Sequence, residues 1–201
     1  KPIRQVTSVH AKIQKGVAAA YDVFETIDES PEQDPGTYSP DRVEGDIEFD
    51  EVAFRYRDQL DNVLEGISFS IPAGQSVALV GRSGSGKSTL VSLIPRFYEY
   101  TGGDIRIDGH SLKEFSLKGL RSQIALVNQN VVLFNDSIAA NIAYGSLRNC
   151  TREEIREAAA KAHALEFIDR MPEGLDTMIG DNGVMLSGGQ RQRLAIARAL
   201  L

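Results

Sequence analysis

The hydrophobic pattern at the start of the chain has the period of an α-helix. Apolar side chains recur at steps of three or four positions from Val6 to Ile27, which predicts a helix with one apolar face over residues 1–28. Two interpretations remain open for it: a helix packed on its own domain, or a connecting helix whose partner surface lies elsewhere. Residues 29–45 are rich in proline, glycine and acids and are typical of a linker.

Short β-like runs begin at residue 46. Apolar and polar residues alternate over 47–56, with a one-residue slip that a β-bulge would absorb. Further strands are predicted at 67–71 and 104–108. Two more apolar runs, 76–80 and 124–127, have the composition of strands that are buried on both faces of a sheet.

Helical patterns dominate the second half of the chain. Two short helices, after Lys87 and over 116–122, are interspersed with the strands. The later helices are predicted at residues 137–144 and 151–171 and from Ser187 onwards. Strands first and helices later indicate an α/β domain over residues 46–201 that carries a helical subdomain.

Composition narrows the class of protein. With 42% hydrophobic residues in 201 the chain can form a core, and its longest apolar runs are far shorter than the ~20 residues that span a bilayer. We therefore expect a soluble chain, and its first residues do not have the pattern of a signal peptide. A net charge of -6 argues against a nucleic-acid partner. Cys150 is the only cysteine, so an intrachain disulfide is excluded.

The strongest motif for chemistry is Gly81-Arg82-Ser83-Gly84-Ser85-Gly86-Lys87-Ser88-Thr89. It fits the phosphate-loop pattern G-x-x-x-x-G-K-[ST] and stands between an apolar run and a helix. The glycines permit a tight turn whose N–H groups, together with the helix N-terminus, attract phosphate oxygens. Lys87 supplies a charge for the β- and γ-phosphates, and the Ser88 hydroxyl suits Mg²⁺. A chance glycine-rich turn is the alternative, and the strand–loop–helix context disfavours it.

A second motif is Leu186-Ser187-Gly188-Gly189-Gln190. Ser187 and Gln190 have the spacing of a capping box, so we predict that a helix begins at Gly188. Each glycine in a first helical turn costs about 1 kcal/mol relative to alanine. Two in succession suggest that an anion approaches the bare backbone, although an ordinary cap with flexible glycines is the alternative.

Together the two motifs resemble those of the nucleotide-binding domain of ATP-binding-cassette (ABC) proteins. The resemblance implies a P-loop NTPase (RecA-like) core with an antiparallel β subdomain and a helical subdomain that carries the second motif, the family signature. It covers most of residues 46–201. It implies that ATP and Mg²⁺ are bound, with ATP held between the phosphate loop of one subunit of a homodimer and the signature of the other.

Individual residue roles follow from this resemblance alone. Tyr56 falls where the family stacks an aromatic ring on adenine, and Gln129 where a glutamine reaches the metal and the attacking water. Lys87 and Gln129 would be catalytic, and Ser88 and Gln129 would contact the metal. The implied nucleotide contacts are Tyr56, Gly81, Arg82, Ser83, Gly84, Ser85, Gly86, Lys87, Ser88, Thr89, Gln129, Ser187, Gly188, Gly189 and Gln190.

Several stretches are more specifically similar to the lipid A exporters of Gram-negative bacteria. The stretches are residues 4–28, 80–90, 96–98, 125–136 and 174–201. This resemblance favours the connecting helix: residues 1–28 would extend the last transmembrane segment of the same polypeptide, at the cytoplasmic face of the inner membrane. The implied function is ATP-driven transport of a lipid A-type substrate.

The family's acidic strand after the signature and its switch histidine have no counterpart before Leu201. We therefore expect a domain that is incomplete at its C-terminus and, alone, sustains no ATP hydrolysis. The basic residues Arg191, Arg193 and Arg198 are interpreted as a solvated face or as partners of acids in missing strands. Two further classes stay open: a soluble cassette ATPase of DNA repair or chromosome maintenance, which the short spacing between the motifs disfavours, and a nucleotide-sensing module without turnover.

Overall fold

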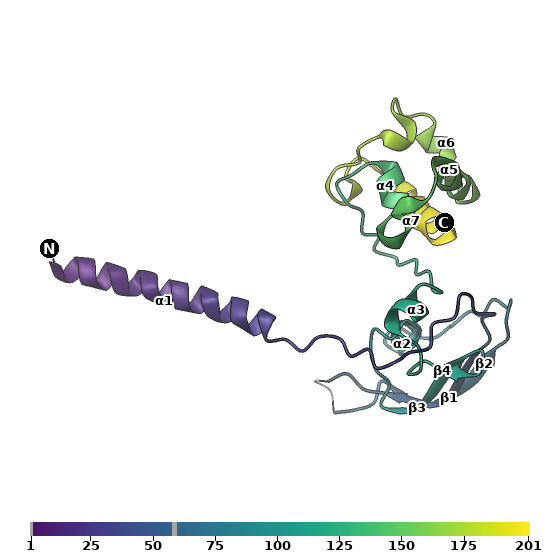
Figure 1. Ribbon diagram of the computed structural model, residues 1–201, viewed down its shortest axis with the longest axis horizontal. Helices are drawn as coiled ribbons and strands as arrows, with labels where there is room; N and C mark the ends of the chain where they lie inside the picture. The colour runs from purple at the N-terminus through teal and green to yellow at the C-terminus, as the bar shows by residue number, and fades with distance from the viewer. Residues whose placement is uncertain (1, 58–59) are drawn as a thin grey trace. The chain divides into compact units, whose positions relative to one another are not determined.

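The structure is a computed structural model that describes residues 2–57 and 60–201, apart from the side chains of residues 2–8, 11, 146 and 148. The chain divides into two units, Lys1–Gly36 and Thr37–Leu201, which can be followed along the colour scale of Figure 1.

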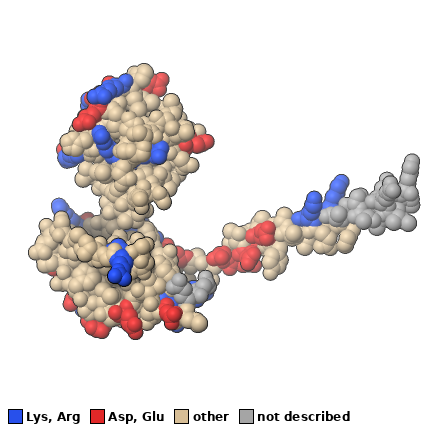
Figure 2. All heavy atoms as spheres, turned by 180° about the vertical axis from the view of Figure 1, so that it is seen from behind, with Lys and Arg blue, Asp and Glu red and all other residues tan. Residues whose placement is uncertain are grey.

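The first unit consists mainly of helix α1 (Pro2–Ile27), so the predicted helix is confirmed. Every described side chain of α1 is exposed, including the apolar Val9, Ile13 and Phe24. Acidic side chains lie toward its C-terminal end and basic ones nearer its middle (Figure 2). Within the described residues, no helix is both long and apolar enough to cross a bilayer. Helix α1 thus presents an apolar face that its own unit does not cover.

The second unit begins with an antiparallel sheet in the order β2-β1-β3-β4. Its strands are β1 (Ile47–Phe54), β2 (Leu64–Ile71), β3 (Gly102–Ile107) and β4 (His110–Ser111). The strands predicted at 47–56, 67–71 and 104–108 are therefore present, and their ends differ from the prediction by at most three residues. The expected bulge is confirmed as a register shift between Phe49 and Val52.

Two short helices pack with this sheet, α2 (Lys87–Leu93) and α3 (Leu117–Arg121). Leu90 and Leu93 of α2 join the buried side chains of the strands in one hydrophobic core. The Ser116 hydroxyl accepts a hydrogen bond from the Gly119 amide and so caps α3. This core fixes the start of α2, which carries part of the phosphate-loop motif, relative to the sheet.

The predicted buried strands at 76–80 and 124–127 are absent, and the prediction was wrong for both. Neither segment is a strand, and Val77 and Val80 are 49% and 89% exposed. A strand that is buried on both faces needs paired neighbours for its backbone and cover for its side chains. Among the described residues, no strand pairs with either segment. Both segments are apolar in composition, but the described residues do not bury them.

The predicted linker is not free along its whole length. Asp108, in the turn after β3, accepts hydrogen bonds from the amides of Glu44, Gly45 and Asp46. The Tyr38 ring stacks on His110 with 4.1 Å between ring centroids. Residues from about Tyr38 onward are therefore bound to the sheet, which agrees with the unit boundary after Gly36.

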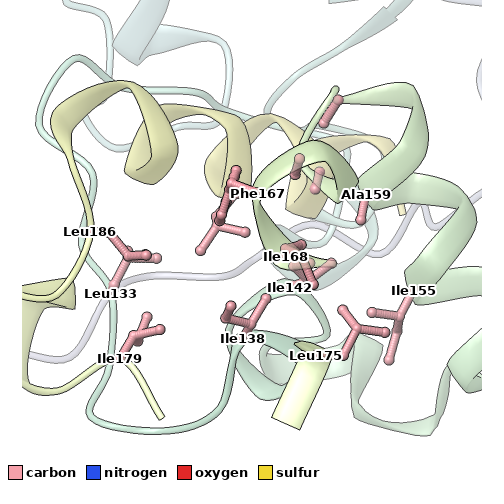
Figure 3. Close-up of a cluster of buried hydrophobic side chains, with 14 of the residues drawn as sticks. Leu133, Ile138, Ile142, Ile155, Ala159, Phe167, Ile168, Leu175, Ile179 and Leu186 are labelled. Atoms are coloured by element: carbon pink, nitrogen blue, oxygen red, sulfur yellow. The ribbon is translucent and has the colours of Figure 1, made fainter. Parts of the chain in front are cut away.

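The remainder of the second unit is helical. It contains α4 (Ile138–Ile142), α5 (Arg152–Lys161), α6 (Leu165–Ile168), α7 (Gly188–Leu200) and the 3₁₀ turns η1 (Gly145–Asn149), η2 (Gly174–Asp176) and η3 (Asp181–Gly183). The helix predicted over 151–171 is broken between α5 and α6, where His163 has φ +55°. Side chains of α4, α5, α6 and α7 converge on a second hydrophobic core, part of which Figure 3 shows.

We predict that Gly103→Ala destabilises the sheet by at least about 2 kcal/mol. Gly103 has φ +72°, and a methyl group there would overlap the backbone carbonyl oxygens of Asp50 and Glu51. The matched control is Gly109→Ala, which has a similar φ of +79° but open space around the methyl group, so that only about 1 kcal/mol is expected. Urea unfolding followed by circular dichroism measures both. Equal losses would show that the close approach of β1 does not matter.

Candidate nucleotide-binding site

The phosphate-loop motif forms a tight turn that leads from residue 80 into α2. Gly86 precedes the first residue of α2 and has φ +82°. The Ser85 amide donates to the Arg82 carbonyl at 3.3 Å. Among the described residues, the amides of Gly84 and Gly86 have no hydrogen-bond acceptor. Unpaired amides at the start of a helix are the groups that bind phosphate oxygens.

Gly86 also requires glycine because it lies against the sheet. A methyl group at this position would lie 2.6 Å from Leu64 Cδ2 and 3.2 Å from the Val63 carbonyl oxygen. Since φ is positive there, any other residue would add backbone strain to this overlap. The loop is thus held close to the beginning of β2.

Lys87 lies over the loop and forms hydrogen bonds with its carbonyl groups. Its ammonium donates to the carbonyl oxygens of Gly81 and Arg82 at 3.0 and 2.8 Å and to Ser85 Oγ at 3.3 Å. These bonds hold the charge beside the unpaired amides. The local arrangement therefore combines a positive charge with unsatisfied N–H donors, as a phosphate site requires.

A cavity of about 380 Å³ opens at this loop. Its walls are formed by Tyr56 and Val63 together with residues 83–89. The structure therefore brings Tyr56 beside the phosphate loop although 25 or more positions separate them in the sequence. Ser88 is exposed on the cavity wall, and its hydroxyl has no hydrogen-bond partner among the described residues. One free hydroxyl fits Mg²⁺, which takes few protein ligands and completes its shell with phosphate and water.

The signature motif begins α7 through a complete capping box. Ser187 Oγ accepts a hydrogen bond from the Gln190 amide, and Gln190 Oε1 accepts one from the Ser187 amide at 2.8 Å. The predicted start of the helix at Gly188 is confirmed. Leu186 is buried in the helical core and anchors the motif. The side chain of Gln190 is engaged in the cap, so its direct role in ligand binding remains a prediction.

Gly188 and Gly189 lie exposed in the first turn of α7 without a local need for glycine. A methyl group would find only Arg191 Nη2, at 4.0 Å, beside Gly188 and nothing within 4 Å beside Gly189. Neither residue has a positive φ. Alanine would fit at both positions and would favour the helix. The glycine pair therefore has no explanation within the described chain, whereas Gly86 does.

Gln129 does not line the cavity of the phosphate loop. It lies with Gly188 and Gln192 on a separate cavity of about 460 Å³. Gln192 Nε2 donates to the Asn128 carbonyl at 3.4 Å. The structure thus groups the predicted residues into two sets, Tyr56 with the phosphate loop and Gln129 with the signature helix.

The interpretation of the arginines of α7 as a solvated face is wrong for Arg198. Its guanidinium donates to the carbonyl oxygens of Asn141 and Val132, and burial lowers its pKa below the usual value for arginine. Asn141 is itself buried and bonds to the backbone of Phe134 through both ends of its amide. These two side chains fix the segment after Gln129. These roles are not apparent from the sequence, because carbonyl partners leave no pattern of residue types.

Among the described residues, no group of three or more histidine, cysteine or acidic side chains is arranged to hold a metal.

The phosphate loop, its lysine and the helix that follows define this chain as a P-loop nucleotide-binding domain. The sequence profile of the family described as "ABC transporter" matches residues 64–201. The chain belongs to the ABC transporter family.

Known relatives match the whole chain. It is 60% identical to the ATP-dependent lipid A-core flippase of Alkalilimnicola ehrlichii and 56% identical to that of Pseudomonas aeruginosa, in each case over 100% of this chain. These matches cover 34% and 33% of the two relatives, so the chain spans about a third of their length. A solved bacterial Atm1-family ABC exporter with ATP bound matches 99% of this chain and 35% of its own, with 40% identity and a TM-score of 0.79.

We predict that Gly189→Ala stabilises the chain by up to about 1 kcal/mol while lowering ATP hydrolysis by the full-length protein. The stability gain follows from helix propensity, and activity would fall if the methyl group blocks the approach of a nucleotide to the bare backbone. Gly16→Ala is the control, because Gly16 is also helical with open space around it. Denaturant unfolding and a phosphate-release assay measure the two effects. If Gly189→Ala behaves like Gly16→Ala in both assays, the glycine pair has no ligand.

Proposed function

We propose that this chain is the ATP-binding and ATP-hydrolysing domain of an exporter that flips lipid A-core lipid across the bacterial inner membrane. The observation that carries the proposal is the 55–60% identity to lipid A-core flippases over the whole chain, α1 included. In this arrangement residues 1–28 continue the last transmembrane helix, 29–45 form a linker and 46–201 form the nucleotide-binding domain at the cytoplasmic face. A soluble DNA-repair ATPase would leave the match over α1 unexplained.

ATP binding is supported by the composition of the phosphate-loop cavity. The Tyr56 ring offers a stacking surface for adenine, and base stacking on an aromatic ring is worth about 1–3 kcal/mol on comparable platforms. Lys87 and the loop amides from Gly84 to Ser88 suit the β- and γ-phosphates. The Ser88 hydroxyl would hold Mg²⁺, which would neutralise charge on the phosphate oxygens during transfer of the γ-phosphoryl group to water.

A homodimer is supported by the separation of the two motifs. Within one chain Gly188 of the signature lines a different cavity from the phosphate loop, so a second copy would supply the signature if both motifs bind one ATP. The exposed amides of Gly188 and Gly189 and the positive end of α7 would then meet the γ-phosphate held by Lys87 of the partner. Such an ATP contacts both subunits only in the closed state, and this differential contact is what shifts the equilibrium toward closure.

The exposure of α1 supports its continuation into a membrane domain. An isolated helix gains little stability in water without packing of its apolar face. Val9, Ile13 and Val17 are all more than half exposed. A partner surface in the transmembrane part of the same polypeptide would cover them. No nucleic-acid partner is proposed, since the net charge is -6.

Lys87→Ala is predicted to weaken ATP binding by the full-length protein at least about tenfold, because a charge-assisted contact is typically worth ~1.5–3 kcal/mol. Calorimetric titration of ATP measures the change. Lys118→Ala is the charge-matched control: Lys118 is exposed on α3 and lines no part of the cavity. Unchanged affinity in a folded Lys87→Ala protein would contradict the phosphate assignment.

The lipid substrate is tested by ATP hydrolysis in reconstituted vesicles. We expect the full-length protein to hydrolyse ATP faster when lipid A is added to phosphatidylethanolamine vesicles, because a transported substrate is coupled to turnover by linkage. Added phosphatidylglycerol is the control for negative charge, and Lys87→Ala should abolish hydrolysis in all vesicles. Equal stimulation by both lipids would leave the ATPase assignment standing and remove lipid A as the specific substrate.

A further inference from the structure

The ring of Tyr56 is held by two other aromatic side chains. It meets the Phe54 ring edge-to-face, with 4.8 Å between centroids and 85° between planes. It meets the Tyr98 ring in the same way, at 5.1 Å and 89°. Edge-to-face pairs at these distances are attractive because the positive edge of one ring faces the negative face of the other. Phe54 belongs to β1, whereas Tyr98 lies beyond the end of α2.

The hydroxyl group of Tyr56 is fixed as well. It shares a hydrogen bond of 2.9 Å with Thr89 Oγ1. Thr89 lies in the first turn of α2, two residues after Lys87, and is only 7% exposed. The bond therefore joins the aromatic ring directly to the helix that carries the phosphate-binding lysine.

The turn that carries Tyr98 is held by two arginine side chains. Arg96 is buried at φ +52° and donates to the carbonyl oxygens of Leu112 and Phe115. Its guanidinium also donates to the Glu99 carboxylate through two N–H groups, at 3.0 and 2.7 Å. Arg121 of α3 donates to the carbonyl oxygens of Pro95 and Arg96 at 3.0 Å each. The Arg121 bonds thus hold the backbone before Tyr98, and the bonded side chains of Arg96 and Glu99 bridge the segment that contains it.

Tyr98 is not placed like a residue whose only task is to fill a core. It is 43% exposed, and its hydroxyl has no hydrogen-bond partner in the described part of the chain. Its contacts are with the rings of Tyr56 and Phe54. A half-exposed side chain on a hydrogen-bonded turn that touches a cavity-lining ring is the arrangement expected of a support for a binding residue.

We propose that Tyr98 is a positioning residue for nucleotide-base recognition. It braces the Tyr56 ring from outside the cavity, and the Tyr56–Thr89 hydrogen bond ties that ring to the phosphate-binding helix. The adenine platform and the phosphate site then keep a fixed separation before the nucleotide arrives, which reduces the ordering cost of binding. The inference rests on the proposed ATP-binding function and assigns a role to a residue outside both motifs.

The test compares a ligand that has a base with one that lacks it. ADP and inorganic pyrophosphate are titrated into the full-length protein by calorimetry, pyrophosphate by displacement of ADP. For Tyr98→Leu we expect ADP affinity to fall about three- to tenfold, on the scale of one aromatic pair, with unchanged pyrophosphate affinity. Tyr98→Phe keeps the ring and should restore wild-type ADP affinity, since the hydroxyl is unbonded.

Each outcome is decisive. If the wild type binds neither ligand, the proposed function fails. If it binds ADP and Tyr98→Leu binds ADP equally well, the positioning role alone is overturned. Equal losses for ADP and pyrophosphate in Tyr98→Leu also overturn it, because they indicate general damage to the phosphate loop. A Tyr98→Phe protein as weak as Tyr98→Leu would exclude the ring as the active element.

A double-mutant cycle tests the hydroxyl tether independently. Tyr56→Phe and Thr89→Val each remove one hydroxyl group of the bonded pair. If the bond positions the ring, the double variant should lose no more ADP affinity than the more affected single variant. Additive losses would show that the two hydroxyls act separately and would contradict the tether.

Discussion

The close contact between Gly86 and the start of β2 is the constraint on which the nucleotide site depends. Gly86 has no room for a side chain beside Leu64, and Leu64 is buried in the core that also contains Leu90 and Leu93 of α2. In the pairing of β1 with β2, Leu64 lies opposite Phe54, which is two residues before Tyr56. One hydrophobic core therefore positions the phosphate loop, the helix behind it and the aromatic ring beside it. The site is preorganised because its parts share a support.

The two glycine motifs of this chain meet different demands. In the phosphate loop, glycine satisfies local geometry, and the function uses the unpaired amides that this geometry leaves. In the signature, Gly188 and Gly189 occupy ordinary helical backbone with space around them. Alanine would make this helix more stable, and no local contact requires glycine instead. Natural sequences commonly sacrifice stability in this way where a ligand or partner must approach. The proposed homodimer, in which a second copy approaches the signature, would account for this difference between the two motifs.

Much of the fold could be predicted from local patterns. The bulge in β1 and the cap at Ser187 have signatures within a few residues, the order of strands before helices follows from the periodicity, and all are present. The apolar runs at 76–80 and 124–127 were misjudged because burial depends on neighbours, which composition does not reveal. The break at His163 was missed because the residue adopts a positive φ that glycine or asparagine usually signals.

The site was predictable where chemistry dictates a spacing and unpredictable where side chains bond to the backbone. The phosphate loop is recognisable from its residue types and their spacing alone. Tyr56 needed the family resemblance, whereas its contact with Tyr98 and its hydrogen bond to Thr89 needed the structure. Arg198 and Asn141 act on carbonyl groups, which every residue possesses, so no pattern of residue types marks their targets.

The exposed segment at 76–80 has a consequence for the loop that follows it. No described strand pairs with this apolar segment, and Val80 is 89% exposed. A strand that paired with it would supply backbone hydrogen bonds and cover its side chains. Because Gly81 follows directly, such pairing would also hold the first residue of the phosphate loop in place.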